Sequence, residues 1–125
     1  MVDPINDYRD LKVWKDSMEL AVNIYGMTDR FPRDEVYGLT AQMRRAAVSI
    51  PSNIAEGFGR GQRRSFIQYL RIAQGSLKEL ETQTVLSERL GFADSAATGA
   101  LALRYEALGK MLRAFIVSLE RKGEG

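Results

Sequence analysis

The sequence predicts an all-α protein, an antiparallel up-down-up-down bundle of four helices. Three observations favour this fold: apolar residues recur every three or four positions, no stretch alternates as a strand does, and the connections between periodic stretches are short. Because short connections leave no room for a long crossover, consecutive helices should run antiparallel. A chain of 125 residues should form one domain (1–125), with an ordered core from about 8 to 121.

The first helix is predicted over residues 10–31, and its apolar side chains cover a wide arc. They fill about half of the helix circumference, which is more than a small monomeric bundle needs. We therefore expect this helix to contact another subunit as well as its neighbours in the bundle. Phe31 precedes Pro32, and a residue before proline disfavours the helical conformation, so the helix should end there. The apolar positions are Leu11, Val13, Trp14, Met18, Leu20, Ala21, Ile24, Tyr25, Met27 and Phe31.

The second helix is predicted to begin after Asp34, a suitable N-cap residue, and to continue through Pro51. Its apolar stripe keeps the same spacing on both sides of the proline, so one helix kinked at Pro51 is expected rather than two helices. Gly57, Gly59 and Gly61 should end it. The stripe consists of Val36, Thr40, Met43, Ala47, Pro51, Ile54 and Phe58.

The third and fourth helices are predicted over residues 62–90 and 95–121. Both carry apolar stripes with alternating spacings of three and four, the pattern of helices that pack side by side. Gly91 stands where a helix-ending glycine belongs, and Asp94 or Ser95 can cap the fourth helix. The two stripes are Phe66, Leu70, Ala73, Leu77, Leu80 and Thr84, and then Leu101, Tyr105, Leu108, Leu112, Phe115 and Leu119.

Composition argues against most enzyme classes. The chain has no cysteine and no histidine, which removes disulfides, thiolate chemistry, the commonest general base and the commonest metal ligand. A di-iron bundle needs Glu-x-x-His motifs, and these are absent. We expect no catalytic activity, no metal and no cofactor. The apolar runs are too short to span a bilayer and the N-terminal MVDPINDYRD has no leader character, so a cytoplasmic protein without membrane contact is expected.

The candidate binding segment is RRAAVSIPSNIAEGFGRGQRR, residues 44–64. Residues 42–72 contain six basic side chains and one acid, which is typical of a surface that binds phosphates. The alternative is that these are basic helix ends held in solvent. The glycines do not indicate a nucleotide loop, because a helix precedes them where a strand is required. The candidate contacts to RNA or DNA phosphates are Arg45, Arg60, Arg63, Arg64 and Arg71.

Other polar residues of this region are predicted to be structural. One of Arg44 and Arg45 should pair with Glu79 or Glu81 on the third helix. Glu56 should pair with Arg60, four residues later; the alternative is a lone functional acid. Side chains near the proline, Ser49, Ser52 and Asn53, should bond the carbonyls that Pro51 leaves free, rather than form a ligand site.

Several stretches together resemble a known family. They are DLKVWKDSMELAVNIY, SFIQYLRIAQGSLKELETQ and, most specifically, the pattern LTxQxRRAxxSIxxNIAEG from Leu39 to Gly57. The chain is similar to the bacterial four-helix bundle proteins first found encoded in intervening sequences of large-subunit ribosomal RNA genes. The resemblance covers about residues 8–121. It implies a homopentamer, five bundles around a central channel, and no catalytic residues.

The accessory variability determinant of diversity-generating retroelements is a more distant relative of that family. It is basic, binds nucleic acid and partners a reverse transcriptase, whereas this chain has a net charge of only +2. The expected function is therefore that of a non-enzymatic oligomer that binds structured RNA or DNA, with a reverse transcriptase or another protein as a further partner. The alternative is a protein–protein adaptor or assembly scaffold with no nucleic-acid role.

Overall fold

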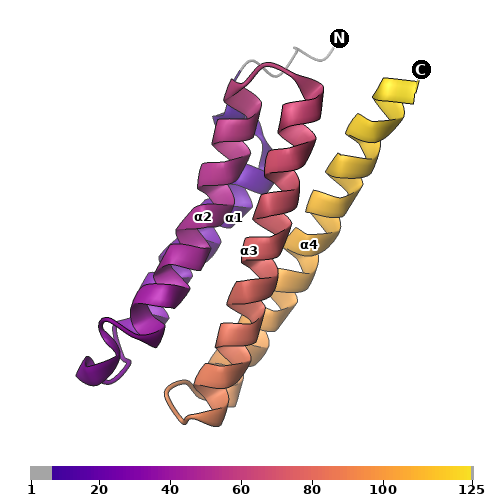
Figure 1. Ribbon diagram of the computed structural model, residues 1–125. Helices are drawn as coiled ribbons and strands as arrows, with labels where there is room; N and C mark the ends of the chain where they lie inside the picture. The colour runs from indigo at the N-terminus through magenta and orange to yellow at the C-terminus, as the bar shows by residue number, and fades with distance from the viewer. Residues whose placement is uncertain (1–6, 125) are drawn as a thin grey trace.

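Four long helices form where the apolar spacing predicts them, and the computed structural model describes residues 7–124 (Figure 1). The helices are α1 (Lys12–Thr28), α2 (Leu39–Gly59), α3 (Arg63–Arg89) and α4 (Ser95–Glu124). Single 3-10 turns, η1 (Tyr8–Asp10) and η2 (Arg33–Glu35), precede α1 and α2. No strand occurs within this described range, so the predicted all-α class is confirmed.

Consecutive helices are antiparallel neighbours. α2 packs between α1 and α3, and α3 packs between α2 and α4. α1 also contacts α4, which closes the bundle, although that contact is the least extensive. The α2–α3 turn and the C-terminal end of α4 lie at one end of the bundle, and the α3–α4 turn lies at the other (Figure 1).

The predicted stripes build the core. Every predicted stripe position of α3 is buried, and so are those of α4 except Phe115. The Phe115 ring is half-buried and meets the ring of Phe66 edge-on, with centroids 5.2 Å apart. On α1 the outer part of the apolar arc stays exposed, including Met18, Val22 and Tyr25.

Several helix ends differ from the prediction. α1 ends at Thr28 and not at Phe31, because the N–H groups of Arg30 and Phe31 make turn hydrogen bonds to the carbonyls three residues before them. α2 does not begin after Asp34, because residues 33–35 form the separate turn η2 behind Pro32. The carboxylate of Glu35 instead accepts a hydrogen bond from the backbone N–H of Leu39, at 3.2 Å, where α2 begins. α4 begins at Ser95 as predicted, with Asp94 accepting from the N–H of Ala97 at 2.8 Å, and it continues to Glu124.

The glycines between helices have different roles from one another. Gly61 and Gly91 adopt positive φ angles, +71° and +78°, and so allow the chain to leave α2 and α3. Gly57 does not end α2, which continues to Gly59. It is buried against α3, and a Cβ there would lie 2.5 Å from the Cβ of Tyr69. The prediction for Gly57 was wrong because close packing of two helices, and not chain reversal, requires this glycine.

α2 runs through Pro51 as a single helix, as predicted. A kink at Pro51 remains a prediction. No helix in the described part of the chain is both long and apolar enough to cross a membrane.

Candidate nucleic-acid interface

The fold gathers basic side chains from two distant segments at one end of the bundle. Three arginines come from the α2–α3 turn and the start of α3, and the last turn of α4 adds two more cations at the same end (Figure 1). We call this set the basic end. It consists of Arg60, Arg63, Arg64, Arg121 and Lys122, all of which are exposed. Because consecutive helices are antiparallel, the end of α4 lies beside the α2–α3 turn. The charge count over residues 42–72 did not include the cations of α4.

Arg60 is held over an aromatic ring. Its guanidinium lies 5.3 Å from the ring centroid of Tyr69 and donates to the Tyr69 hydroxyl at 2.7 Å. Glu56 forms the predicted ion pair with Arg60, at 3.6 Å, and accepts from the Tyr69 hydroxyl at 3.3 Å. Because both charged side chains are more than half exposed, the pair contributes little stability and leaves Arg60 available to a phosphate.

Arg63 and Arg64 differ in their surroundings. Arg63 donates to the backbone carbonyl of Leu119 at 3.4 Å and lies against Gly123, where its positive charge faces the carbonyl end of α4. A side chain at position 123 would overlap its guanidinium. Arg64 has no hydrogen bond or ion pair to any residue of the described range and extends into solvent.

The other two predicted contact residues lie farther along the bundle. Arg71 follows Arg64 by two turns of α3 and pairs with Glu120 at 2.8 Å. Arg45 precedes Arg60 by fifteen residues of α2, roughly 22 Å along the helix. It lines a small cleft of about 210 Å³ with Ser49, Ser76 and Glu79. The structure therefore groups three of the five predicted contacts at the basic end, places Arg71 two turns farther along α3, and separates Arg45 from them.

Arg44 makes an interhelical ion pair, but its partner is not the one predicted. It pairs with Asp29 at the end of α1, at 2.9 Å, and donates through Nε to the Thr28 hydroxyl at 2.9 Å. Its guanidinium also lies 4.5 Å from the ring centroid of Tyr25. The prediction of a partner on α3 was wrong because position 44 faces α1.

Neither predicted glutamate is bound to an arginine among the described residues. Glu81 pairs with Lys78 at 3.0 Å, on its own helix. Glu79 lines the small cleft beside Arg45 without an ion pair.

The polar residues around the proline connect α2 to α3. The hydroxyls of Ser49 and Ser76 are 2.8 Å apart, and Asn53 donates to the carbonyl and hydroxyl of Ser49 at 2.7 and 2.9 Å. A backbone carbonyl is bonded, as expected, but Pro51 removes the donor for Ala47, not for Ser49. Ser52 is exposed and contributes no bond of this kind. Sequence reasoning missed Ser76, which becomes a partner only when α3 packs beside α2.

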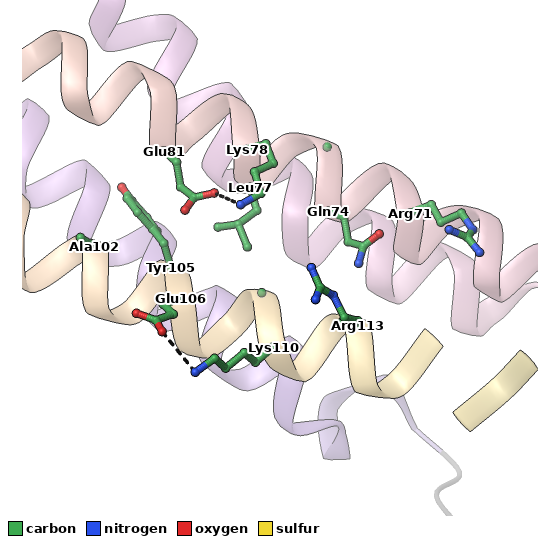
Figure 2. Close-up of a pocket in the computed structure, with 12 residues that line it drawn as sticks. Arg71, Gln74, Leu77, Lys78, Glu81, Ala102, Tyr105, Glu106, Lys110 and Arg113 are labelled. Atoms are coloured by element: carbon green, nitrogen blue, oxygen red, sulfur yellow. Dashed lines mark ion pairs between the residues drawn. The ribbon is translucent and has the colours of Figure 1, made fainter. Parts of the chain in front are cut away.

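A groove of about 710 Å³ lies between α3 and α4 (Figure 2). Four cations line it, two from each helix, and Arg71 is the only one among the predicted contacts. The other three, Lys78, Lys110 and Arg113, were missed because their proximity depends on the register between the helices. The spacing of Arg64, Arg71 and Lys78 by seven residues was the available signal, since it puts them on one face of α3.

The groove is charged at its rim, and its floor is partly apolar, with the half-buried carboxylate of Glu81 beside Tyr105. Lys78 and Lys110 pair along their own helices with Glu81 and Glu106, at 3.0 and 3.1 Å. The floor includes Leu77 and Tyr105, whose hydroxyl lies 2.7 Å from that of Thr84. Burial raises the pKa of Tyr105 to about 12, so the phenol is neutral at physiological pH.

Metal chemistry has no visible basis in the described residues, which contain no group of three or more acidic side chains close enough to hold an ion. With no histidine or cysteine in the chain, phosphate contact by cations is the chemistry that these surfaces support best.

Comparisons with known proteins bear out the resemblance seen in the sequence. A solved structure of a protein of unknown function from the S23 ribosomal protein family of Bacteroides thetaiotaomicron has the same fold, with a TM-score of 0.74. It is 25% identical, and the match covers 83% of this chain and 97% of that one. No curated protein matches the chain. The profile of the 23S rRNA-intervening sequence protein family matches residues 9–114, so the chain belongs to that family.

Proposed function

We propose that the protein is a non-enzymatic, oligomeric accessory factor that binds structured RNA or DNA through the phosphates at its basic end. One observation carries the proposal: cations from the α2–α3 turn and from the last turn of α4 converge on one end of the bundle. Exposed arginines and lysines next to one another attract a polyphosphate backbone and displace its counterions. The name of the family refers to 23S ribosomal RNA and is compatible with an RNA ligand.

The residues fit contact with the backbone rather than base reading. Arg60 is positioned on Tyr69, Arg64 is free of partners in the described range, and Arg63 lies on the carbonyl end of α4. None of these residues extends from a helix that could lie in a major groove with several side chains on base edges. We therefore expect weak sequence preference and strong salt dependence.

The test is a fluorescence-anisotropy titration of a structured RNA and a DNA duplex from about 50 to about 200 mM salt. Replacing Arg60, Arg63 and Arg64 with glutamine should weaken binding about tenfold or more and lower the salt slope by about two to three. The control removes the same charge from the opposite end, by replacing Arg30, Arg33 and Arg89, which are also exposed. Equal losses in the two triple variants would show that net charge, and not the basic end, governs binding.

A second candidate function, a protein adaptor or scaffold, is favoured by an apolar groove on the other side of the molecule. This groove of about 460 Å³ lies between α1 and α2 and includes Trp14, Met18, Val22, Tyr25 and Val48. Helical grooves of this kind accept amphipathic helices, from a second copy of the chain or from another protein. A pull-down before and after nuclease treatment separates the two functions, because an adaptor keeps its partner once nucleic acid has been removed.

The absence of catalysis and a cytoplasmic location complete the proposal. A chain without cysteine has no need of an oxidising compartment, and a chain without histidine lacks the commonest general base.

A further inference from the structure

The groove between α3 and α4 is continuous in charge with the basic end. On α3, Arg64, Arg71 and Lys78 follow one another at seven-residue intervals, about 10 Å apart on one face. On α4, Lys110, Arg113 and Arg121 fall within an arc of about 80°. From the basic end the two rows continue to the walls of the groove, where Arg71 and Lys78 lie on α3 and Lys110 and Arg113 lie on α4 (Figure 2).

We propose that this groove holds a single-stranded segment of nucleic acid that continues from the phosphates bound at the basic end. The inference rests on the proposed function and adds the strandedness of the ligand. The groove has a volume of about 710 Å³, which admits part of one strand. The helices that form it have axes only about 8–10 Å apart, so the groove is narrow. A duplex is too wide, since its major groove alone measures about 12 Å.

The cations of the groove are available to phosphates. Lys110 is engaged only in an exposed pair with Glu106 along its own helix, and such a pair exchanges partners at little cost. Lys78 is itself exposed, but its partner Glu81 is only 31% exposed, so this pair is held more firmly. Arg113 has no ion pair or hydrogen bond to a residue of the described range, and its side chain points toward Gln74 across the groove (Figure 2). These two side chains can donate hydrogen bonds to one phosphate from opposite walls.

Two glycines keep the floor open. A Cβ at Gly75 would have no neighbour within 4 Å, and a Cβ at Gly109 would lie 3.7 Å from Leu77 Cδ2. Glycine in a helix interior lowers helix stability, and neither position needs it for close helix packing. What the two glycines provide is space above Leu77 and the neutral Tyr105, where the sugar and base of a nucleotide can lie.

The experiment fills the groove without changing its charge. Gly109→Leu places an apolar side chain in the floor, and Ala114→Leu adds similar bulk at an exposed position of α4 outside the groove. Each variant and the parent are titrated with a labelled unstructured RNA strand and with an RNA hairpin that has no single-stranded tail. If Gly109→Leu does not fold, as judged by circular dichroism, Gly75→Leu fills the groove from the other wall.

We expect Gly109→Leu to weaken binding of the strand about tenfold and to leave the hairpin unchanged, because only the strand loses its groove contacts. Ala114→Leu should bind both as the parent does. Arg113→Gln should lower the salt slope by about one for the strand alone.

Two results would overturn the inference. If Gly109→Leu binds the strand as tightly as the parent, the strand does not enter the groove. If a free mononucleotide at the same nucleotide concentration displaces the strand, the groove is a site for free nucleotides instead. The proposed function is judged separately, because replacing Arg60, Arg63 and Arg64 should weaken both the strand and the hairpin. If Gly109→Leu has no effect on strand binding but the triple arginine variant does, the proposal for the basic end is unaffected.

Discussion

At the residue scale, Gly57 is a position where the packing of α2 against α3 leaves no room for a side chain. A Cβ at this position would lie 2.5 Å from the Cβ of Tyr69 and 3.1 Å from Cδ1 of Phe66. The Tyr69 Cβ cannot rotate away, so α2 and α3 would have to separate. We expect Gly57→Ala to lower the free energy of unfolding by about 1–2 kcal/mol, since the strain exceeds the gain in helix propensity.

Denaturant unfolding measures this effect, and Gly59→Ala is the matched control. A Cβ at Gly59, two residues later, has no neighbour within 4 Å. That variant should be as stable as the parent or more stable by up to about 1 kcal/mol. An unchanged midpoint for Gly57→Ala would mean that the helices can move apart without loss.

Individual residues also show which contacts the sequence predicts and which it does not. The Glu56–Arg60 pair was predictable because a spacing of four on one helix fixes the geometry. The Arg44–Asp29 pair was not, since it depends on how α1 crosses α2. The role of Gly57 was missed for the same reason: glycine suits both a helix end and a close helix contact, and only the packing distinguishes them.

At the scale of the elements, Arg44 joins the end of α1 to the second turn of α2. It bonds the Thr28 hydroxyl, pairs with Asp29 and stacks on Tyr25, all near the carbonyl end of α1. We expect Arg44→Met to lower the free energy of unfolding by about 1–2 kcal/mol, through loss of these bonds and of the favourable charge at the helix terminus. Arg44→Lys should recover little, because an ammonium group cannot reproduce the planar fork.

The variant Asp29→Asn measures the contribution of the ion pair to stability separately from the contacts of Arg44 with Thr28 and Tyr25. The Asp29 side chain is 77% exposed, so its pair with Arg44 should contribute less than about 1 kcal/mol. Thermal or urea unfolding of the three variants checks the order. If Asp29→Asn costs as much as Arg44→Met, the ion pair dominates and the stacking and hydroxyl contacts contribute little.

Helix interiors were more predictable than helix ends. The stripes of α3 and α4 are set by side-chain spacing, and the buried residues follow them. The start of α2 was misplaced because Asp34 satisfies the N-cap preference locally, while Pro32 and the turn η2 delay the helix until Leu39. A cap preference is worth about 1 kcal/mol, which tertiary packing can override.

At the scale of the whole molecule, topology decides which charges meet. The central basic segment was visible in the sequence, but the cations at the end of α4 join it only because four antiparallel helices bring residues 60 and 121 to the same end. The α3–α4 groove arises in the same way, from register between helices that the sequence pattern does not specify. Candidate residues were therefore easier to predict than the surface that they form.

The exposed face of α1 leads to a prediction about assembly. Val22 is 69% exposed and lines the apolar groove between α1 and α2 together with Met18, Tyr25 and Val48. An apolar patch of this kind on a small bundle favours burial against a second copy, and the family resemblance implies five copies of the 14.0 kDa chain. Val22→Lys would place a charge in that contact and should shift the mass measured by light scattering toward the monomer.

Val36→Lys is the control, because Val36 is also exposed but lies outside the groove, in the connection before α2. It should keep the mass of the parent, and circular dichroism should show both variants folded. A parent that already has the mass of one chain would contradict an oligomer of any size. An oligomer that Val22→Lys leaves intact would instead place the contact on another face of the bundle, and the groove between α1 and α2 would then be open to a different protein.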